Sequence, residues 1–259
     1  MKNILITGGN GYIAKSIYSA LHRKHNITII TRQDFDLTCW VSTDRFFKDK
    51  SFDIIIHTAT SGGSRLKEET DLVIKENLLM YRNILNHQDK FTKFIGFGSG
   101  AELNNPTTPY GISKQIIADS MSSKPGFLNI RIFAVFDENE LDTRFIKSNI
   151  VRYINHENMV IHGDKLMDFF YMKDLISLVD YFLQKEEWFV NGIDCRYLES
   201  YRLSEIAAII NELDDYKVQI EVGNSVGIDY IGTYRGLPNT LVGLEQGIKN
   251  VYNIIKQNK

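Results

Sequence analysis

The N-terminus holds the pattern that most constrains how this chain can fold. A short apolar run, Asn3 to Thr7, is typical of a buried strand. The turn Gly8-Gly9-Asn10-Gly11 follows it, and then Ile13, Ile17 and Leu21 recur at the spacing of a helix. A strand, a glycine turn and a helix in this order form the first half of a dinucleotide-binding unit. The glycines permit a tight turn, and the N–H groups at the helix N-terminus can bind a pyrophosphate.

Alternating strands and helices continue through the first half of the chain. We expect strands near 2–7, 26–31, 53–58, 93–98 and 127–133, and helices near 12–24, 43–49, 70–87 and 110–122. This alternation predicts an α/β fold with a doubly wound parallel sheet, that is, a Rossmann fold. The second half is less regular, and residues 214–242 carry no usable pattern. The elements expected in the second half are a strand at 159–162 and helices at 143–155, at 174–184 and from Leu203 onward.

Composition excludes several classes of function. The chain has 259 residues, of which 43% are apolar, and its net charge of −2 gives no electrostatic reason to bind nucleic acid or an acidic membrane. No apolar run approaches the roughly 18 residues that a membrane helix needs, and the N-terminus is a core strand rather than a signal peptide. Cys39 and Cys195 are too few to staple the fold, and the six histidines show no metal-binding spacing. We therefore expect a cytoplasmic protein without a metal site.

A tyrosine and a lysine four residues apart are candidates for acid–base chemistry. Tyr110 and Lys114 lie within an expected helix, and side chains at this spacing share a helix face. A lysine beside a phenol stabilises the phenolate and lowers the pKa of the phenol. Ser99, eleven residues before Tyr110, offers a hydroxyl that can hold a substrate oxygen. The three residues suit proton transfer at a carbonyl, and the glycine turn gives this otherwise common spacing its weight.

Five segments, in order along the chain, resemble one family. Thr7 to Ala14 resembles the Thr-Gly-x-x-Gly-x-x-Gly fingerprint of the extended short-chain dehydrogenase/reductase family, with Ala14 at the third glycine. This family contains nucleotide-sugar epimerases, dehydratases and reductases. Four further matches follow at 53–59, Glu76-Asn77, 168–175 and 243–248. The resemblance covers nearly the whole chain, and an ordered set of matches is far more specific than any one of them.

The resemblance implies a Rossmann domain followed by a small C-terminal substrate lobe. The dinucleotide-binding domain should span 1–133, with 159–185 returning to it, and 134–259 should form mainly the substrate-binding lobe. Family members often dimerise through the helices that correspond to 70–87 and 110–122, so a homodimer is an expectation here. The implied partner is a small-molecule nucleotide sugar, with no nucleic acid and no membrane.

The resemblance also assigns the cofactor-binding residues. They are Gly8, Asn10, Gly11, Tyr12, Ile13, Arg32, Asp36, Leu37, Thr58, Ala59, Thr60, Asn77, Tyr110 and Lys114. Arg32 stands near the end of the second strand, where NAD-preferring enzymes of this fold place a carboxylate for the ribose. A guanidinium can bind a 2′-phosphate through two hydrogen bonds, which favours NADP(H). The alternative is NAD(H), with Arg32 solvated and Asp34 binding the ribose.

The residues after Ser99 discriminate among the reactions of the family. Sugar dehydratases follow this hydroxyl residue with an Asp-Glu pair, whereas here Gly100 and Ala101 stand in that place and Glu102 comes one position late. Enzymes of the GDP-fucose synthase type that also epimerise at carbon carry a cysteine at the position of Ala101. Dehydration and epimerisation next to the ketone are therefore disfavoured. The remaining groups suit hydride and proton transfer at one carbon–oxygen bond.

Two enzymatic hypotheses need only Ser99, Tyr110, Lys114 and a nicotinamide. The first is reduction of a keto group, at C4, of a nucleotide-linked sugar, with Tyr110 as the acid. The resemblance is closest to ketoreductases of the GDP-fucose synthase type. The second is 4-epimerisation by an enzyme with tightly bound NAD. A third hypothesis is a non-catalytic member of the family that senses NADP(H).

The substrate side of the sequence departs from the family. Ala134 replaces a usual asparagine, and Met167 replaces an arginine that often grips the diphosphate. Other basic residues can supply this charge, although their alternative interpretation is a solvated face. The candidates are Arg144, Lys165 and Arg235.

Overall fold

The computed structural model describes residues 1–64, 67–104, 106–237 and 241–258, and the chain divides into two compact units. Unit 1 comprises Met1–Arg131 and Asp180–Ile193, and unit 2 comprises Ile132–Val179 and Asp194–Lys259. The segment expected to return to the first unit is 159–185, and of these residues 159–179 belong to unit 2 and 180–185 to unit 1. Helix α6 (Met172–Gln184) therefore begins in unit 2 and ends in unit 1.

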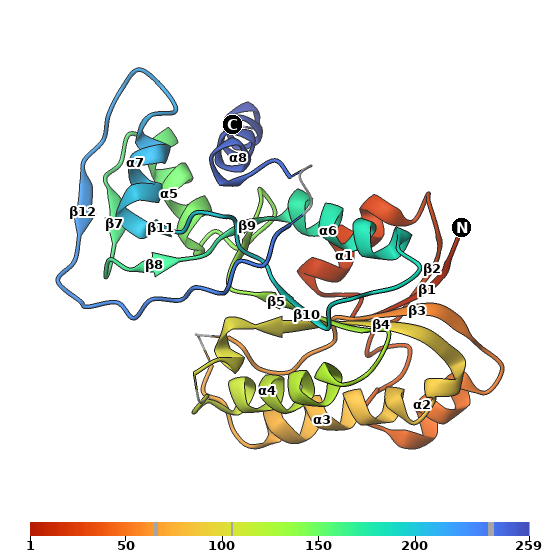
Figure 1. Ribbon diagram of the computed structural model, residues 1–259. Helices are drawn as coiled ribbons and strands as arrows, with labels where there is room; N and C mark the ends of the chain where they lie inside the picture. The colour runs from red at the N-terminus through yellow and green to blue at the C-terminus, as the bar shows by residue number, and fades with distance from the viewer. Residues whose placement is uncertain (65–66, 105, 238–240, 259) are drawn as a thin grey trace. The chain divides into compact units, whose positions relative to one another are not determined.

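Unit 1 is built on a sheet of the Rossmann type. Its elements are β1 (Asn3–Thr7), α1 (Tyr12–Leu21), β2 (Asn26–Ile29), α2 (Trp40–Phe47), β3 (Phe52–His57), α3 (Leu72–Leu85), η1 (Gln88–Lys90), β4 (Phe91–Ser99), η2 (Gly100–Glu102), α4 (Pro109–Ser122), β5 (Phe127–Ile132) and β10 (Gly192–Asp194). The strand order is β10-β5-β4-β3-β1-β2, with β1 parallel to β2 and β3, and β3 parallel to β4. Helices α2, α3 and α4 lie on one face of the sheet and α1 on the other (Figure 1). The predicted doubly wound α/β fold is confirmed.

The strand register brings three loops to one edge of the sheet. Thr7 pairs with His57, and His57 pairs with Gly96. The glycine turn after β1, the segment 58–60 after β3 and the end of β4 therefore lie together. In open parallel sheets, ligands bind at this carboxyl edge.

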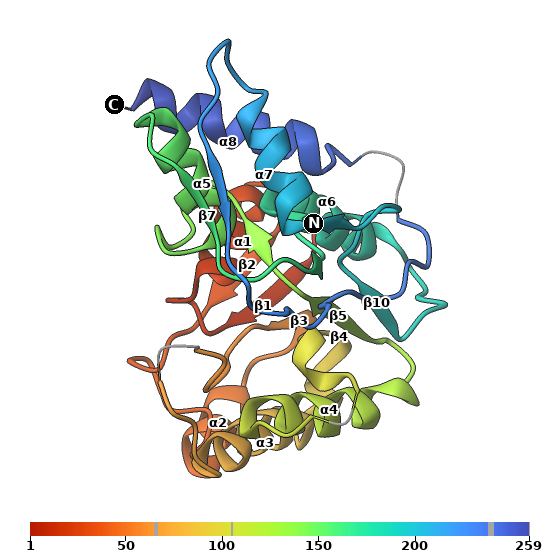
Figure 2. The same ribbon diagram turned by 90° about the vertical axis from the view of Figure 1, so that its left-hand side faces the viewer.

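The core of unit 1 explains why these segments fold as they do. The apolar residues of β1, Ile4 to Ile6, are fully buried. On the face that α2, α3 and α4 cover, Phe94 stacks on Phe127 with ring centroids 5.2 Å apart. Helices α3 and α4 lie side by side over this face (Figures 1 and 2). Full burial of an aliphatic or aromatic side chain contributes about 1.5–3 kcal/mol.

Unit 2 combines short strands with helices, and it also holds the first part of α6. Its elements are β6 (Val135–Phe136), α5 (Phe145–Ile154), β7 (Met159–Ile161), β8 (Leu166–Met167), β9 (Phe170–Tyr171), β11 (Tyr201–Arg202), α7 (Leu203–Asn211), β12 (Ile220–Val222) and α8 (Leu244–Gln257). Two-stranded sheets pair β6 with β9, β7 with β12, and β8 with β11. Helices α5, α7 and α8 bury one shared core, to which Ile150, Ile206 and Ile248 contribute.

Some elements differ from those that the sequence predicts. Strands β10 and β12 have only three residues each, too few to show a period. Helix α2 begins at Trp40, before the expected helix at 43–49. None of the helices within the described ranges is long and apolar enough to cross a membrane.

Candidate active site

The glycine turn after β1 has the geometry of a phosphate cradle. Gly8 has a φ of +69°, and a Cβ placed on it would lie 2.7 Å from the Cα of Ala59. Gly9 N–H donates to the carbonyl of Ile30 (2.8 Å), and Gly11 N–H donates to the carbonyl of Gly8 (2.8 Å). Helix α1 then begins with no capping side chain and no acidic residue in its first turn. An uncapped N-terminus beside bare glycine backbone fits the pyrophosphate of a dinucleotide.

Thr7 ties the ends of β1 and β3 together beside this turn. Its hydroxyl oxygen accepts from Ala59 N–H (3.3 Å) and lies 2.8 Å from His57 Nδ1. The Thr58 hydroxyl donates to the Thr7 carbonyl (2.7 Å). The backbone at 58–60, where the cofactor is expected, is thus held in place by residues of both strands.

His57 is a buried histidine behind this edge. Burial, and to a lesser degree the charge of Lys114, lowers the pKa of His57 to about 3. A neutral imidazole matches its hydrogen bond to Thr7. The histidine is therefore a structural residue of the core rather than a proton carrier at neutral pH.

His57 should make the protein acid-sensitive. Below its unfolded pKa near 6.5, the unfolded chain takes up a proton that the folded chain cannot, so stability falls as the pH drops from 6.5 toward 3. The slope from this group is about 1.4 kcal/mol per pH unit. Urea unfolding at pH 7.5 and pH 5 should show a smaller loss of stability for His57→Gln than for the wild type. His22→Gln, at an exposed position, is the control and should keep the wild-type slope.

The predicted cofactor discriminator, Arg32, lies in an acidic setting. Its side chain is 71% exposed and pairs with Asp36 (3.0 Å), with Glu76 at 3.9 Å. The carboxylate of Asp34 instead accepts from the backbone N–H (2.8 Å) and the hydroxyl (2.9 Å) of Thr31, closing the turn after β2. The guanidinium thus faces solvent, whereas Asp34 is already engaged.

The candidate relay is built by the end of β4 and the first turns of α4. Thr108 caps α4 by accepting from Gly111 N–H (3.1 Å). Lys114 Nζ lies 5.5 Å from the centre of the Tyr110 ring and donates to the carbonyl of Phe97 (2.7 Å). The predicted shared helix face is therefore present. The bond to Phe97 also joins this face to the strand that ends in Ser99.

The environment of Lys114 favours loss of its proton. Burial lowers the pKa of Lys114 to about 8, and the negative charge of Glu102 opposes this shift. A cavity of about 10 Å³ beside the lysine is lined by His57, Asn77 and Asn129, among others. This volume suits about one water molecule.

Two further residues hold the relay, and one of them had no sequence signal. Glu69 accepts from the backbone N–H groups of Gly63 (2.5 Å) and Tyr110 (3.0 Å). Asn77, expected at the cofactor, is buried and binds Ser61 through both of its amide atoms, and it also donates to Ser113 (2.9 Å). Glu69 lies in an irregular segment far from Tyr110 in the sequence, so no periodicity points to this contact.

Glu102 is buried and fully engaged. One of its carboxylate oxygens accepts from Arg131 Nε (2.6 Å) and Asn129 Nδ2 (2.8 Å), and the other accepts from Ser99 N–H (3.1 Å). Buried behind these partners, the carboxylate is not open to a substrate.

Comparison with known proteins assigns the chain to a family. The family model described as "NAD dependent epimerase/dehydratase family" matches residues 4–193. The chain belongs to this family. The epimerase/dehydratase assignment makes it an NAD(P)-dependent enzyme of the extended short-chain dehydrogenase/reductase type. No curated protein sequence matches the chain significantly.

Solved structures show the same fold at low sequence identity. The GDP-mannoheptose C4 reductase MlghC of Campylobacter jejuni, with NADP bound, has a TM-score of 0.80 at 15% identity, covering 98% of each chain. A UDP-glucose 4-epimerase of Thermotoga maritima has a TM-score of 0.79 at 16% identity, covering 99% of each chain. A GDP-L-fucose synthetase of Naegleria fowleri, bound to NADP, has a TM-score of 0.71 at 17% identity, covering 98% of this chain and 93% of the other.

The basic residues predicted for the substrate lie on three segments of unit 2. Arg144 is the exposed N-cap of α5. Lys165 precedes β8, with its Nζ 6.0 Å from the centre of the Tyr230 ring. Arg235 is exposed in the segment 231–237. Their roles toward a diphosphate stay predictions, as does the homodimer.

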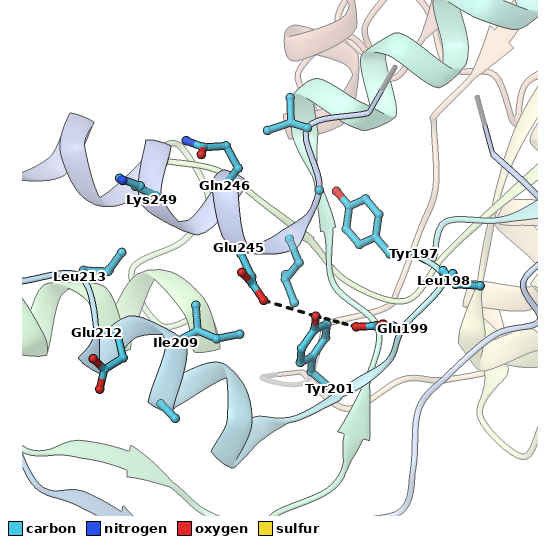
Figure 3. Close-up of a pocket in the computed structure, with 14 residues that line it drawn as sticks. Tyr197, Leu198, Glu199, Tyr201, Ile209, Glu212, Leu213, Glu245, Gln246 and Lys249 are labelled. Atoms are coloured by element: carbon cyan, nitrogen blue, oxygen red, sulfur yellow. Dashed lines mark hydrogen bonds between the residues drawn. The ribbon is translucent and has the colours of Figure 1, made fainter. Parts of the chain in front are cut away.

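A larger cavity lies within unit 2, between residues 197–201, helix α7 and the beginning of α8 (Figure 3). Its volume is about 910 Å³. The Tyr201 hydroxyl lies between Glu199 (3.1 Å) and Glu245 (3.5 Å). The charged residues of the lining are Glu199, Glu212, Glu245 and Lys249. Three carboxylates against one ammonium make this cavity unsuitable for a diphosphate.

Within the described ranges, no group of His, Cys, Asp or Glu side chains could hold a metal ion.

Proposed function

We propose that this protein is an NADPH-dependent reductase of a keto group, at C4, of a nucleotide-linked sugar. The observation that carries the proposal is the contact of Tyr110 and Lys114 on one face of α4, joined through Phe97 to the strand that ends in Ser99. Several solved structures of this fold, at low identity, are sugar-nucleotide reductases and 4-epimerases. The reacting groups of this chain meet the needs of both reactions.

Each residue of the relay has one role in the proposed reduction. The bound dinucleotide supplies the hydride. The Tyr110 hydroxyl gives its proton to the carbonyl oxygen, and the Lys114 ammonium stabilises the phenolate that results. The Ser99 hydroxyl donates a hydrogen bond to the same oxygen and stabilises the charge that develops there.

The surroundings of the relay argue against dehydration. Elimination of water needs a second acid–base pair, and Gly100 and Ala101 provide none. Glu102 follows them, but its carboxylate is buried against Arg131 and Asn129. The site is thereby left with chemistry at a single carbon–oxygen bond.

The preference for NADPH rests on Arg32. Its pair with Asp36 is exposed and is worth at most about 1 kcal/mol, so the guanidinium can turn to a 2′-phosphate at little cost. Arg32→Ser should weaken NADPH binding about 10–100-fold, because a hydrogen bond to a charged group contributes about 1.5–3 kcal/mol. Binding of NADH should stay unchanged. Quenching of intrinsic fluorescence by each cofactor measures both constants. Arg23→Ser, at an exposed arginine after α1, is the matched control, and equal losses for both cofactors would contradict the assignment.

A direct assay tests the proposed function. Purified protein is mixed with NADPH and a panel of GDP-, UDP- and dTDP-linked 4-keto-6-deoxy sugars, and loss of NADPH absorbance is followed. Turnover with one nucleotide is the expected result. Absence of turnover across the panel would overturn the proposal.

The alternative, a 4-epimerase, is favoured by the fact that Ser99, Tyr110 and Lys114 suffice for it. Such an enzyme retains its cofactor and consumes none. Release of NAD on denaturation of the purified protein, together with conversion between 4-epimers without net NADPH loss, would favour this function over the reductase.

A further inference from the structure

Glu102 lies in the short turn that presents Ser99. The Ser99 Oγ accepts from Ala101 N–H (3.2 Å), and Glu102 reaches back to accept from Ser99 N–H (3.1 Å). These two bonds form a capping box around η2. The turn in which the Ser99 hydroxyl is held is therefore fixed in part by Glu102, a residue that is only 3% exposed.

The same carboxylate packs against the end of the strand that binds the Lys114 ammonium. A Cβ placed on Gly98 would lie 2.6 Å from Glu102 Oε2, so the carboxylate packs directly against that residue. The preceding residue, Phe97, is the one whose carbonyl accepts from Lys114. Asn129, which donates to Glu102, also lines the cavity beside Lys114.

We propose that Glu102 is a positioning residue of the relay: it holds Ser99 through the backbone and keeps Lys114 in its ammonium form by placing one negative charge beside it. The inference rests on the proposed function, in which Lys114 must carry a charge to stabilise the Tyr110 phenolate. Arg131 holds the carboxylate in place from β5 (2.6 Å).

Among the described residues, Glu102 is the charged group that supports the Lys114 ammonium. From β3, His57 is neutral because burial lowers its pKa to about 3. From β5, Arg131 is positive and pairs with Glu102 (2.6 Å). Glu69 binds the backbone of Tyr110, on the helix of Lys114 itself. Burial already lowers the pKa of Lys114 to about 8, and Glu102 is the charge that raises it.

Two variants separate this role from a structural one. Glu102→Gln and Arg131→Gln both break the same ion pair, so a purely structural defect would be alike in both. Only Glu102→Gln removes for certain the negative charge that supports the Lys114 ammonium, whereas Arg131→Gln keeps the carboxyl group. The alkaline limb of the kcat profile for reduction should move about one pH unit or more to lower pH in Glu102→Gln and by less in Arg131→Gln. Identical limbs in both variants would overturn the proposal.

A second measurement needs no substrate. Competitive labelling with trace acetic anhydride across pH, followed by mass spectrometry of the peptide that contains Lys114, reports when the amine loses its proton. The midpoint should fall in Glu102→Gln relative to the wild type, and by less in Arg131→Gln. One shared midpoint would overturn the proposal even if the enzyme is active. Shifted midpoints without turnover on any keto sugar would instead sustain the role of Glu102 and contradict the proposed function.

Discussion

Tyr110→Phe should lower turnover about 10²–10⁴-fold, the range that one general acid contributes to an enzyme. The variant removes only the hydroxyl, so the ring can keep its place beside Lys114 and under the loop at Gly63, where a Cβ would lie 3.1 Å from the ring. The fold should therefore be unchanged. Stopped-flow or steady-state loss of NADPH absorbance with the best keto sugar measures the effect.

Tyr81→Phe is the matched control for Tyr110→Phe. Tyr81 is a buried tyrosine of α3 whose hydroxyl donates to Ser120 (3.2 Å), away from the carboxyl edge of the sheet. Its loss should cost stability of about 1 kcal/mol but no turnover. If Tyr110→Phe kept full turnover, Tyr110 would not be the acid. If the protein turned over no substrate and Tyr110→Phe left its biological role intact, the NADP(H)-sensing hypothesis would be favoured instead.

Unit 1 could be predicted from the sequence because its local signals agree with one another. The apolar run 3–7, the turn at 8–11 and the spacing of Ile13 and Ile17 each point to the same strand-turn-helix unit. Burial on both faces of a parallel sheet makes the strands continuous apolar runs, which are easy to find. The contact of Tyr110 with Lys114 follows from helix geometry alone.

The supports of the site could not be predicted, because they depend on pairs that are distant in the chain. In the sequence, Glu102 is only an acidic residue one position later than in the dehydratases. The fold brings Asn129 and Arg131 to its carboxylate. Glu69 meets Tyr110 across 41 residues through a segment without periodicity. A single sequence contains periods and local motifs, but it contains no record of which loops meet.

Gly8→Ala, in the turn after β1, should lower the free energy of unfolding by about 3 kcal/mol or more and abolish cofactor binding. The positive φ of +69° costs an alanine about 1–2 kcal/mol. The added Cβ would also lie 2.7 Å from the backbone N and Cα of Ala59, atoms that belong to the segment after β3 and cannot turn aside. The turn must then shift, and its N–H groups with it. Thermal unfolding and NADPH titration measure the two losses.

Gly236→Ala separates the two causes of this effect. Gly236 also has a positive φ, +82°, but a Cβ there would meet no atom within 4 Å. Its substitution should cost only the backbone strain, about 1–2 kcal/mol, which is a fall in Tm of about 2–8 °C for a chain of this size. The difference between the two variants measures the close approach of Ala59 to the turn. Equal losses would mean that the positive φ alone, and not this approach, makes glycine necessary at position 8.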